Sequence, residues 1–201
     1  MISAVIFDFG NVICRFDNRI ILQRISDRTG KSIAELQEIV HASIHLVVDY
    51  EQGLTTSHEF FRQISDLVGL NISEDEFVRL YTDKFSPIPE TFELIRSLKG
   101  RYKLGLLSNT SEWDFEHGIR TTPVFPLFDA VTLSFRVHAL KPAAEIYHDM
   151  LDKLKEKGEH CVYIDDLQEN VLAARSIGMN AIHYQQGQNL AELLAGYLER
   201  G

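Results

Sequence analysis

Three of the most apolar runs in the sequence end in residues that could do chemistry. Asp8 follows the run VIF, Ser108 and Asn109 follow LGLL, and Asp165 and Asp166 follow VYI. Together they offer a nucleophilic carboxylate, a hydroxyl and amide pair, and two further acids. Each could also be the solvated end of a strand. However, the carboxyl ends of parallel strands lie at one edge of a sheet, where α/β proteins bind ligands, so the coincidence of all three favours a common site.

Lys141 adds a positive charge to this set. In the stretch ALKPAAEIY, Pro142 predicts the first turn of a helix, with Lys141 just before the N-terminal end, where anions bind. A single lysine at such a position is typical of a surface charge. Combined with the strand ends, it completes what phosphoryl transfer needs: a nucleophile, donors to the phosphoryl oxygens and a cation that stabilises the transition state.

The clustered acids predict a metal ion. Two like charges about 4 Å apart repel each other by about 4 kcal/mol at an effective dielectric constant of about 20. Asp8, Asp166 and a phosphate dianion therefore need a counter-ion if they share one site. Oxygen ligands select a hard cation, and an octahedral site linked to phosphate is typical of Mg²⁺, which we expect as the cofactor.

The elements that must position these residues follow an α/β pattern. After a first strand at 5–7, strand-like and helix-like stretches alternate from Pro87 onward. We expect strands at 102–109, 128–135, 160–166 and 180–184, and helices at 90–100, 142–158, 168–179 and 189–200. This alternation predicts a doubly wound parallel sheet with helices on both faces.

The stretch between the first strand and Pro87 has a different character. Residues 18–85 contain several helical patterns and no convincing strand. We therefore predict an α/β core formed by residues 1–16 and 87–201, with a small α-helical cap formed by residues 17–86 inserted after the first strand.

Composition excludes several classes of function. The chain has 201 residues, of which 45% are hydrophobic and 24% charged, which is ordinary for a globular protein. A formal net charge of −9 argues against nucleic-acid binding. No apolar run approaches the ~20 residues of a membrane span, and the N-terminal residues lack a signal-peptide pattern. With only two cysteines, Cys14 and Cys161, we expect reduced thiols and a cytoplasmic location. The sequence does not indicate an oligomeric state.

At this point the motifs resemble those of the haloacid dehalogenase-like (HAD) hydrolase superfamily across essentially the whole chain. VIFDFGNVI is similar to its first motif, LLSNT to its second, LKPAAEIY to its third and VYIDDLQENVLAA to its fourth. Any one of these motifs is weak, whereas all four in the right order are a specific signal. The helical insertion also lies where that family carries a small α-helical cap.

The resemblance implies a role for each candidate residue. Asp8 would be a metal ligand and the nucleophile that becomes an aspartyl-phosphate. Ser108 and Asn109 would bind the phosphoryl group, and Lys141 would balance the charge of nucleophile and phosphate. Asp166 would be a direct Mg²⁺ ligand, and Asp165 would act through water.

Gly10 is the main departure from the family pattern. Most phosphatases of the family carry a second aspartate there, which acts as general acid and base. Glycine retains the main-chain carbonyl that binds the metal but lacks the carboxyl group, whose contribution is typically about 10²–10⁴-fold. The form FDFGNVI resembles a subgroup that includes α-D-glucose-1-phosphate phosphatases, so glycine favours a leaving group that departs easily, such as an anomeric oxygen. Asp17 is one candidate for a replacement acid.

The sequence therefore predicts a Mg²⁺-dependent phosphatase acting on a small phosphorylated metabolite, with a sugar phosphate as one candidate. Two alternatives stay open. One is a binding or regulatory protein that kept the fold after losing its acid; the other is a metal-independent 2-haloacid dehalogenase. Specificity is expected in the cap and in the loop 15–17. The cap turn at 50–52 could face the substrate.

Overall fold

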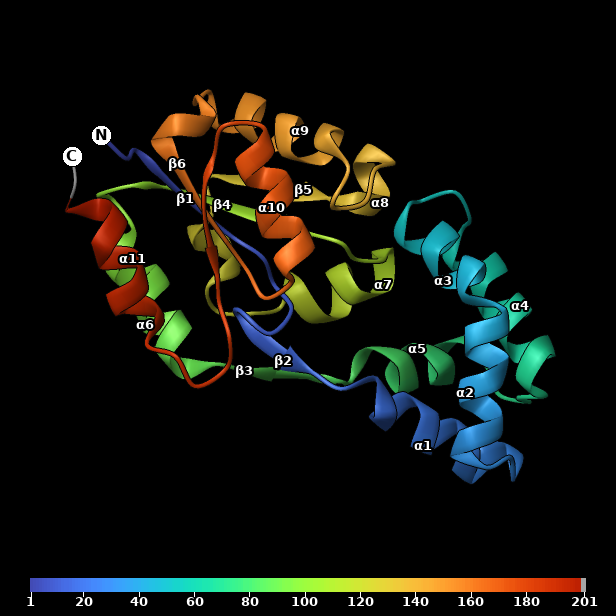
Figure 1. Cartoon of the computed structure of the whole chain (residues 1–201). Helices are drawn as coiled ribbons and strands as arrows, with labels where there is room; N and C mark the ends of the chain where they lie inside the picture. The colour runs from blue at the N-terminus through green and yellow to red at the C-terminus, as the bar shows by residue number, and fades with distance from the viewer. Residues whose placement is uncertain (200–201) are drawn as a thin grey trace.

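A parallel five-stranded sheet forms the centre of the computed structural model, which describes residues 1–199 (Figure 1). The strand order is β5-β4-β1-β6-β7. The strands are β1 (Ala4–Phe7), β4 (Lys103–Ser108), β5 (Ala130–Leu133), β6 (Cys161–Asp165) and β7 (Asn180–His183). Because β1 is central and pairs in parallel with β4 and β6, the residues that follow these three strands emerge side by side at the same edge.

Helices cover both faces of this sheet. α6 (Pro89–Leu98) and α11 (Leu190–Leu198) pack on one face, and α9 (Ala144–Leu154) and α10 (Gln168–Ser176) pack on the other. The alternation of β1 explains this arrangement, since Val5 and Phe7 enter the first core while Ala4 and Ile6 enter the second. The predicted doubly wound core is confirmed. The last residue of the helix expected at 189–200, Arg200, lies outside the described residues.

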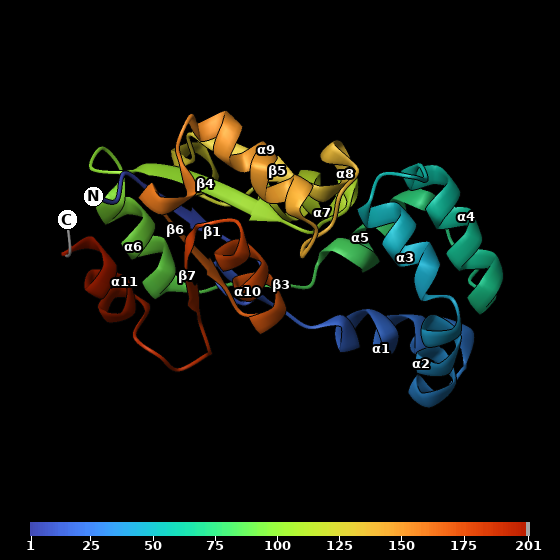
Figure 2. The same cartoon turned by 45° about the horizontal axis from the view of Figure 1, so that its top comes forward.

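The helical insertion after the first strand is also confirmed. It contains α1 (Asn18–Thr29), α2 (Ile33–Ala42), α3 (Ile44–Glu51), α4 (Ser57–Val68) and α5 (Glu74–Thr82), which we call the α1–α5 lobe. Figures 1 and 2 show this lobe beside the core rather than on a face of the sheet. Its aromatic centre comprises Tyr50, Phe60, Phe77 and Tyr81, and Trp113 from α7 (Glu112–Asp114) of the core completes it.

The helices within residues 1–199 are short. The longest, α1 and α4, have 12 residues each. None of the described helices combines the length and the apolar character needed to cross a bilayer.

The structure differs from the expected elements at several places. β2 (Cys14–Phe16) pairs antiparallel with β3 (Phe85–Pro87) where the chain enters and leaves the lobe. Strands of three residues are too short to show a periodicity, so the sequence did not predict them. The strand expected at 128–135 is shorter, because the chain turns into α8 (Ser134–Val137). The helix expected at 142–158 spans only α9, and it ends where Lys155 adopts a left-handed conformation (φ 55°).

The turn after α3 fastens the lobe to the core. Ser134 Oγ donates a hydrogen bond to the carbonyl oxygen of Glu51 (2.6 Å), and Gln52 Nε2 donates one to the carbonyl oxygen of His138 (3.1 Å). Gly53 follows with φ 69°, and a Cβ atom there would lie 2.1 Å from the carbonyl oxygen of Phe135. Only glycine allows the two backbones to approach this closely.

We predict that Gly53→Ala loosens this attachment. The added methyl group cannot coexist with the Phe135 carbonyl oxygen, so the turn must move away from α8. Hydrogen exchange of the main-chain amides at 51–55 and 134–138 should become faster, and small-angle scattering should show a larger molecule.

Gly69→Ala is the matched control. Gly69 has a similar φ of 71°, but no atom lies within 4 Å of its added Cβ. Both variants lose about 1 kcal/mol of unfolding free energy to the left-handed conformation, whereas only Gly53→Ala should change exchange at the contact. Equal exchange profiles for the two variants would contradict this account.

Candidate active site

The three strand ends meet, as the sequence predicted. Asp8 follows β1, and Asp165 and Asp166 end and follow β6. Ligand oxygens of these three carboxylates lie within 4.8 Å of one another. Ser108 at the end of β4, its neighbour Asn109 and Gly10 line a cleft beside the carboxylates.

Lys141 joins two of the three acids. Its Nζ lies 2.6 Å from Asp8 Oδ1 and 2.8 Å from Asp165 Oδ2, and it also donates to the carbonyl oxygen of Leu107 (3.4 Å). All three charged side chains are buried. Burial by itself lowers the pKa of Lys141, but the attraction of Asp8 and Asp165 outweighs it and holds the net pKa above its ordinary value. The lysine therefore stays protonated between the two carboxylates.

Asn109, rather than a helix terminus, positions Lys141. Its side-chain amide accepts a hydrogen bond from Lys141 N (2.8 Å) and donates one to the carbonyl oxygen of Lys141 (3.1 Å). The prediction that Pro142 begins a helix directly after Lys141 is wrong, since α9 starts at Ala144. The local reason is that the chain turns at 141–143 before α9 begins, with Lys141 fixed by this pair of hydrogen bonds.

Asp165 is fully engaged by the protein. Besides Lys141, it accepts hydrogen bonds from Leu167 N (2.8 Å), from Asn170 Nδ2 (3.1 Å to each oxygen) and from the Tyr163 hydroxyl. Its side chain has no exposure to solvent. A carboxylate with this many donors is held in one orientation and has little capacity left for a direct ligand.

Asp166 is held more loosely. Asn11 Nδ2 donates the side-chain hydrogen bond recorded for this carboxylate, at 2.9 Å. Asn11 itself adopts a left-handed conformation (φ 55°), which asparagine tolerates better than most residues. Burial raises the pKa of Asp166, the Asn11 hydrogen bond opposes this, and the charge of Asp165 adds to the rise. Sequence reasoning missed Asn11, although an asparagine directly after Gly10 was an available signal.

The charges of the site fit a divalent cation. Burial is the largest effect on Asp8 and raises its pKa to about 7, although Lys141 opposes the rise. The charges of Asp165 and Asp166 raise it further. The cluster thus holds three carboxylates and one lysine, which leaves two formal negative charges at a site where two of the three acids are buried. An all-oxygen donor set with this excess charge suits Mg²⁺.

Phe16 occupies the space beside Gly10. A Cβ atom on Gly10 would lie 2.9 Å from Phe16 Cε1, and 3.7 Å from Asp8 Oδ2. The restriction at this position is therefore the neighbouring ring, and a larger side chain here requires Phe16 to move. Phe16 ends β2 and lines the cleft, and sequence reasoning had placed only its loop, 15–17, near the substrate.

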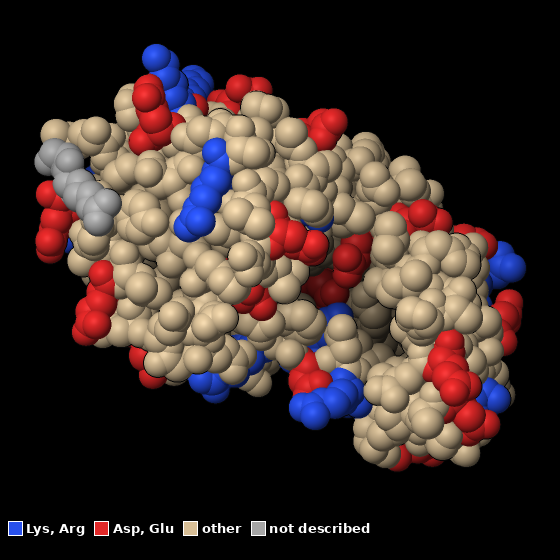
Figure 3. Space-filling model, in the orientation of Figure 1, with Lys and Arg blue, Asp and Glu red and all other residues tan. Residues whose placement is uncertain are grey.

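A second set of charges lines the same cleft, which has a volume of about 90 Å³. Lys84 Nζ and Asp114 Oδ2 form a buried ion pair at 2.8 Å that joins the lobe to the core. Asp114 Oδ1 is buried and has no hydrogen-bond partner among the described residues. Glu51, at the end of α3, completes the set. Figure 3 shows acidic and basic atoms inside the hollow between the lobe and the core.

The raised pKa of Glu51 suits a group that donates a proton at neutral pH. Burial, followed by the charge of Asp114, raises the pKa of Glu51 to about 7. Lys84 and Lys141 act in the opposite direction. The sequence offered no way to pair Glu51 with Gly10, because the two are brought together only by the attachment of the lobe.

Asp17, the acid weighed from the sequence, is engaged elsewhere. Its carboxylate caps α1 by accepting from Arg19 N (2.9 Å) and pairs with the Arg19 guanidinium (2.7 Å). The hydrogen bonds from Arg19 lower the pKa of Asp17, so this group is ionised at neutral pH. It also does not line the cleft beside Gly10.

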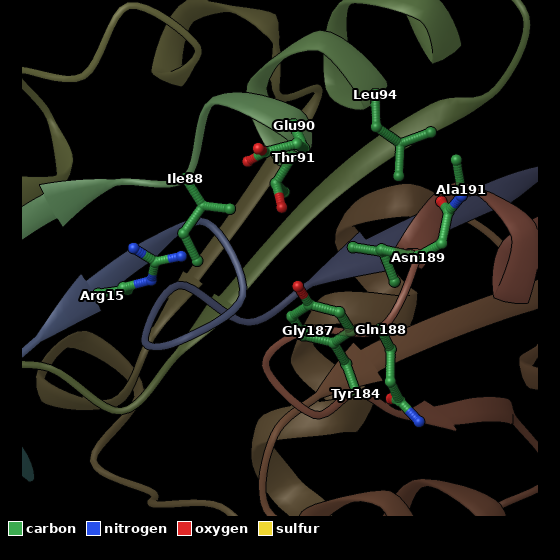
Figure 4. A pocket seen from close by; sticks show the side chains of 11 residues that line it. Arg15, Ile88, Glu90, Thr91, Leu94, Tyr184, Gly187, Gln188, Asn189 and Ala191 are labelled. Carbon is green, nitrogen blue, oxygen red and sulfur yellow. The ribbon is translucent and has the colours of Figure 1, made fainter.

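Figure 4 shows a different cavity, of about 410 Å³, near β2, α6 and α11. Its lining includes Arg15, Thr91, Tyr184 and Asn189. It contains none of the predicted catalytic, phosphate-binding or metal-binding residues. The smaller cleft between the lobe and the core, by contrast, contains Gly10, Ser108 and Asn109 of the predicted site.

The unequal bonding of the paired acids generates a prediction about stability. Asp165→Ala removes one of the two carboxylates paired with Lys141 and leaves Asn170 Nδ2 and the Tyr163 hydroxyl without the buried acceptor that they share, and should cost about 3–5 kcal/mol of unfolding free energy. Asp166→Ala removes one hydrogen bond and relieves a repulsion, and should stay within about 1 kcal/mol of the wild type. Denaturant unfolding in a chelator measures the unfolding free energy of both variants. Equal losses of unfolding free energy would contradict a stabilising role for the hydrogen bonds to Asp165.

Comparisons with known proteins support an assignment to a family. A family model described as haloacid dehalogenase-like hydrolase matches residues 2–178. The chain is 24% identical over 194 residues to a D-ribitol-5-phosphate phosphatase of Bacteroides thetaiotaomicron, covering 93% of this chain and 94% of that protein. It is 27% identical over 183 residues to the sesquiterpene phosphatase AstK of Aspergillus oryzae, covering 90% and 89%.

A solved structure extends the comparison to the fold. A HAD-family enzyme from Bacteroides thetaiotaomicron, crystallised with magnesium and inorganic phosphate, superposes with a TM-score of 0.86 at 20% identity. The match covers 96% of this chain and 99% of that one. The shared fold and the family model that spans most of the sequence lead to one conclusion: the chain belongs to the haloacid dehalogenase-like hydrolases.

Proposed function

We propose that this protein is a Mg²⁺-dependent phosphatase that hydrolyses a small phosphomonoester through a phosphorylated Asp8. The observation that carries the proposal is the buried Lys141 ammonium, 2.6 Å from Asp8 and 2.8 Å from Asp165, within a cluster of three carboxylates. Lys141 opposes the rise that burial causes in the pKa of Asp8, and it orients this carboxylate at a site that an anionic substrate can enter.

Asp8, Asp166 and the main-chain carbonyl of Gly10 would hold the metal ion, with Asp165 acting through water. Asp166 suits direct ligation because it has one protein donor, whereas Asp165 has several. When bound, the ion neutralises the excess negative charge and polarises the phosphoryl group. Its presence in the related crystal structure supports the same cofactor here.

In the first step an Asp8 carboxylate oxygen attacks the phosphorus, and the bond between phosphorus and the ester oxygen breaks. Lys141 holds Asp8 in place and offsets the negative charge of nucleophile and phosphoryl group. Ser108 and Asn109 line the cleft where the phosphoryl oxygens bind, and the side chain of Asn109 also fixes Lys141.

Glu51 supplies the proton that Gly10 cannot. Glu51 lines the cleft together with Gly10, Ser108 and Asn109, and burial raises its pKa to about 7. We assign it to protonating the departing alkoxide. In the second step the resulting Glu51 carboxylate takes a proton from water as that water attacks the phosphorus of the aspartyl-phosphate, which releases phosphate and regenerates Asp8.

The α1–α5 lobe acts as the cap in this proposal. Residues 17–86 would form the cap and residues 1–16 and 87–201 the core, of which residues 200 and 201 lie outside the described structure. The cap contributes Glu51 and Lys84 to the site. We place the enzyme in the cytoplasm, where its two buried thiols, Cys14 and Cys161, stay reduced.

The alternatives fit the site less well. Halide displacement from carbon needs no metal, so a dehalogenase has no use for two additional carboxylates facing Asp8. A protein that only binds its ligand has no use for a buried lysine paired with a carboxylate nucleophile.

The alcohol of the substrate is a separate question. The relatives named above are a phosphatase of a sugar-alcohol phosphate and a phosphatase of sesquiterpenes. The resemblance of FDFGNVI to the α-D-glucose-1-phosphate phosphatases makes a sugar phosphate the first candidate from the sequence. All of these are phosphorylated small metabolites, which is the class of substrate we propose.

We predict that Asp8→Asn reduces phosphomonoester hydrolysis by roughly 10⁴-fold or more, as expected when a nucleophile is removed. The variant should remain folded, since Lys141 keeps its pairing with Asp165. Wild-type activity towards p-nitrophenyl phosphate should disappear in a chelator and return with Mg²⁺. Equal rates with and without the chelator, or an active Asp8→Asn variant, would overturn the proposal.

We predict that Glu51→Gln slows hydrolysis of alkyl phosphates by about 10²–10⁴-fold and affects p-nitrophenyl phosphate much less, because nitrophenolate departs without a proton. Since the acid must be protonated, wild-type turnover of alkyl phosphates should fall as pH rises through about 7, and the variant should lose this dependence.

Asp17→Asn is the control for Glu51→Gln, because asparagine also caps helices well. It should leave the dependence on the leaving group unchanged. The assignment fails if Asp17→Asn, and not Glu51→Gln, selectively slows the alkyl esters.

A further inference from the structure

The α1–α5 lobe contains a cavity of about 180 Å³. Its walls come from α1 to α5 and are almost wholly apolar, including Ile21, Ile25, Val47, Phe60, Ile64 and Phe77. An apolar cavity of about 150 Å³ is large enough to hold a benzene-sized ligand. The space is partly open to solvent, so a ligand can enter it.

This cavity adjoins the catalytic cleft. Asn18, Glu51 and Lys84 line both spaces, and they are the polar residues, apart from the Tyr81 hydroxyl, in the lining of the apolar one. These three polar residues therefore lie at the border between the cleft that contains Ser108 and Asn109 and a space lined by branched aliphatic and aromatic side chains.

We infer that the substrate is the phosphate ester of an apolar alcohol, such as an alkyl or isoprenoid alcohol, whose hydrocarbon chain occupies the cavity of the lobe. This inference rests on the proposed phosphatase function and names its substrate class. The ester oxygen lies at the border of the two spaces, within reach of Glu51, and the hydrocarbon lies beyond it.

The lining argues against a sugar phosphate as the best substrate. Sugar hydroxyls buried among Ile21, Ile64 and Phe77 would find no hydrogen-bond partners, and burying unpaired hydroxyls is unfavourable. Conversely, a hydrocarbon chain would cover apolar side chains that both spaces leave open to water. Phe16 in the cleft is 39% exposed and Ile44 in the lobe cavity is 50% exposed.

A series of primary n-alkyl phosphates tests the inference, because lengthening the chain leaves the reacting ester group unchanged. We expect kcat/KM to rise by about fourfold for each added methylene until the cavity is filled, and then to level off. Ribitol 5-phosphate and glucose 1-phosphate, assayed alongside, should be poorer substrates than the best alkyl ester.

The possible failures are distinguishable. If p-nitrophenyl phosphate and the sugar phosphates are hydrolysed while kcat/KM stays flat or falls with chain length, the inference is overturned and the phosphatase function stands. If no ester is hydrolysed with Mg²⁺ present, the proposed function fails and the inference fails with it.

Variants of the lobe test whether the dependence of kcat/KM on chain length arises in this cavity. Val47→Phe fills the cavity and should lower the ratio of octyl to ethyl phosphate kcat/KM by more than the about fourfold of one methylene. Ile64→Ala enlarges it and should shift the best chain length upward, which gives a second test should Val47→Phe fold poorly. Leu67→Phe, on an exposed position of α4 outside the cavity lining, is the control. It should change neither the ratio of octyl to ethyl phosphate kcat/KM nor the best chain length. Unchanged chain-length profiles in both cavity variants would overturn the inference.

Discussion

The buried contact of one lysine with two carboxylates is the interaction on which the rest of the structure depends. Lys141 lies between Asp8 and Asp165 with almost no exposure to solvent. Such a group is stable only while every charge in it has partners, because an unpaired buried charge costs several kcal/mol. The strand order, the turn held by Asn109 and the hydrogen bonds to Asp165 all act to keep these charges together.

The same contact leaves the site incomplete without a substrate and a cation. One lysine cannot neutralise Asp8, Asp165 and Asp166, and the charges of the other two acids add to the rise that burial causes in the pKa of Asp8. In our account, Mg²⁺ resolves this imbalance, and the phosphoryl group then enters a site whose charges are matched. The lobe lies on the other side of the cleft and brings Glu51 into the same lining as Gly10, which carries no carboxyl group.

The fold and the centre of the site could be predicted because their signals are local. Each of Asp8, Ser108 and Asp165 ends an apolar strand, and the parallel arrangement of those strands follows from the alternation of elements. The ribbon of β2 and β3 was missed because three residues carry no periodicity. The sequence did not predict, for a different reason, that Glu51, Lys84 and Asp114 lie together. These residues come from three separate elements, and only the packing of the lobe against the core brings them together.

The stereochemical course at phosphorus tests the central claim most directly. The account requires two successive in-line displacements, first by Asp8 and then by water, each of which inverts the configuration. Hydrolysis of an ester with an isotopically chiral phosphoryl group should therefore proceed with overall retention. Overall inversion would mean that water attacks the ester directly, and it would contradict the role assigned to Asp8.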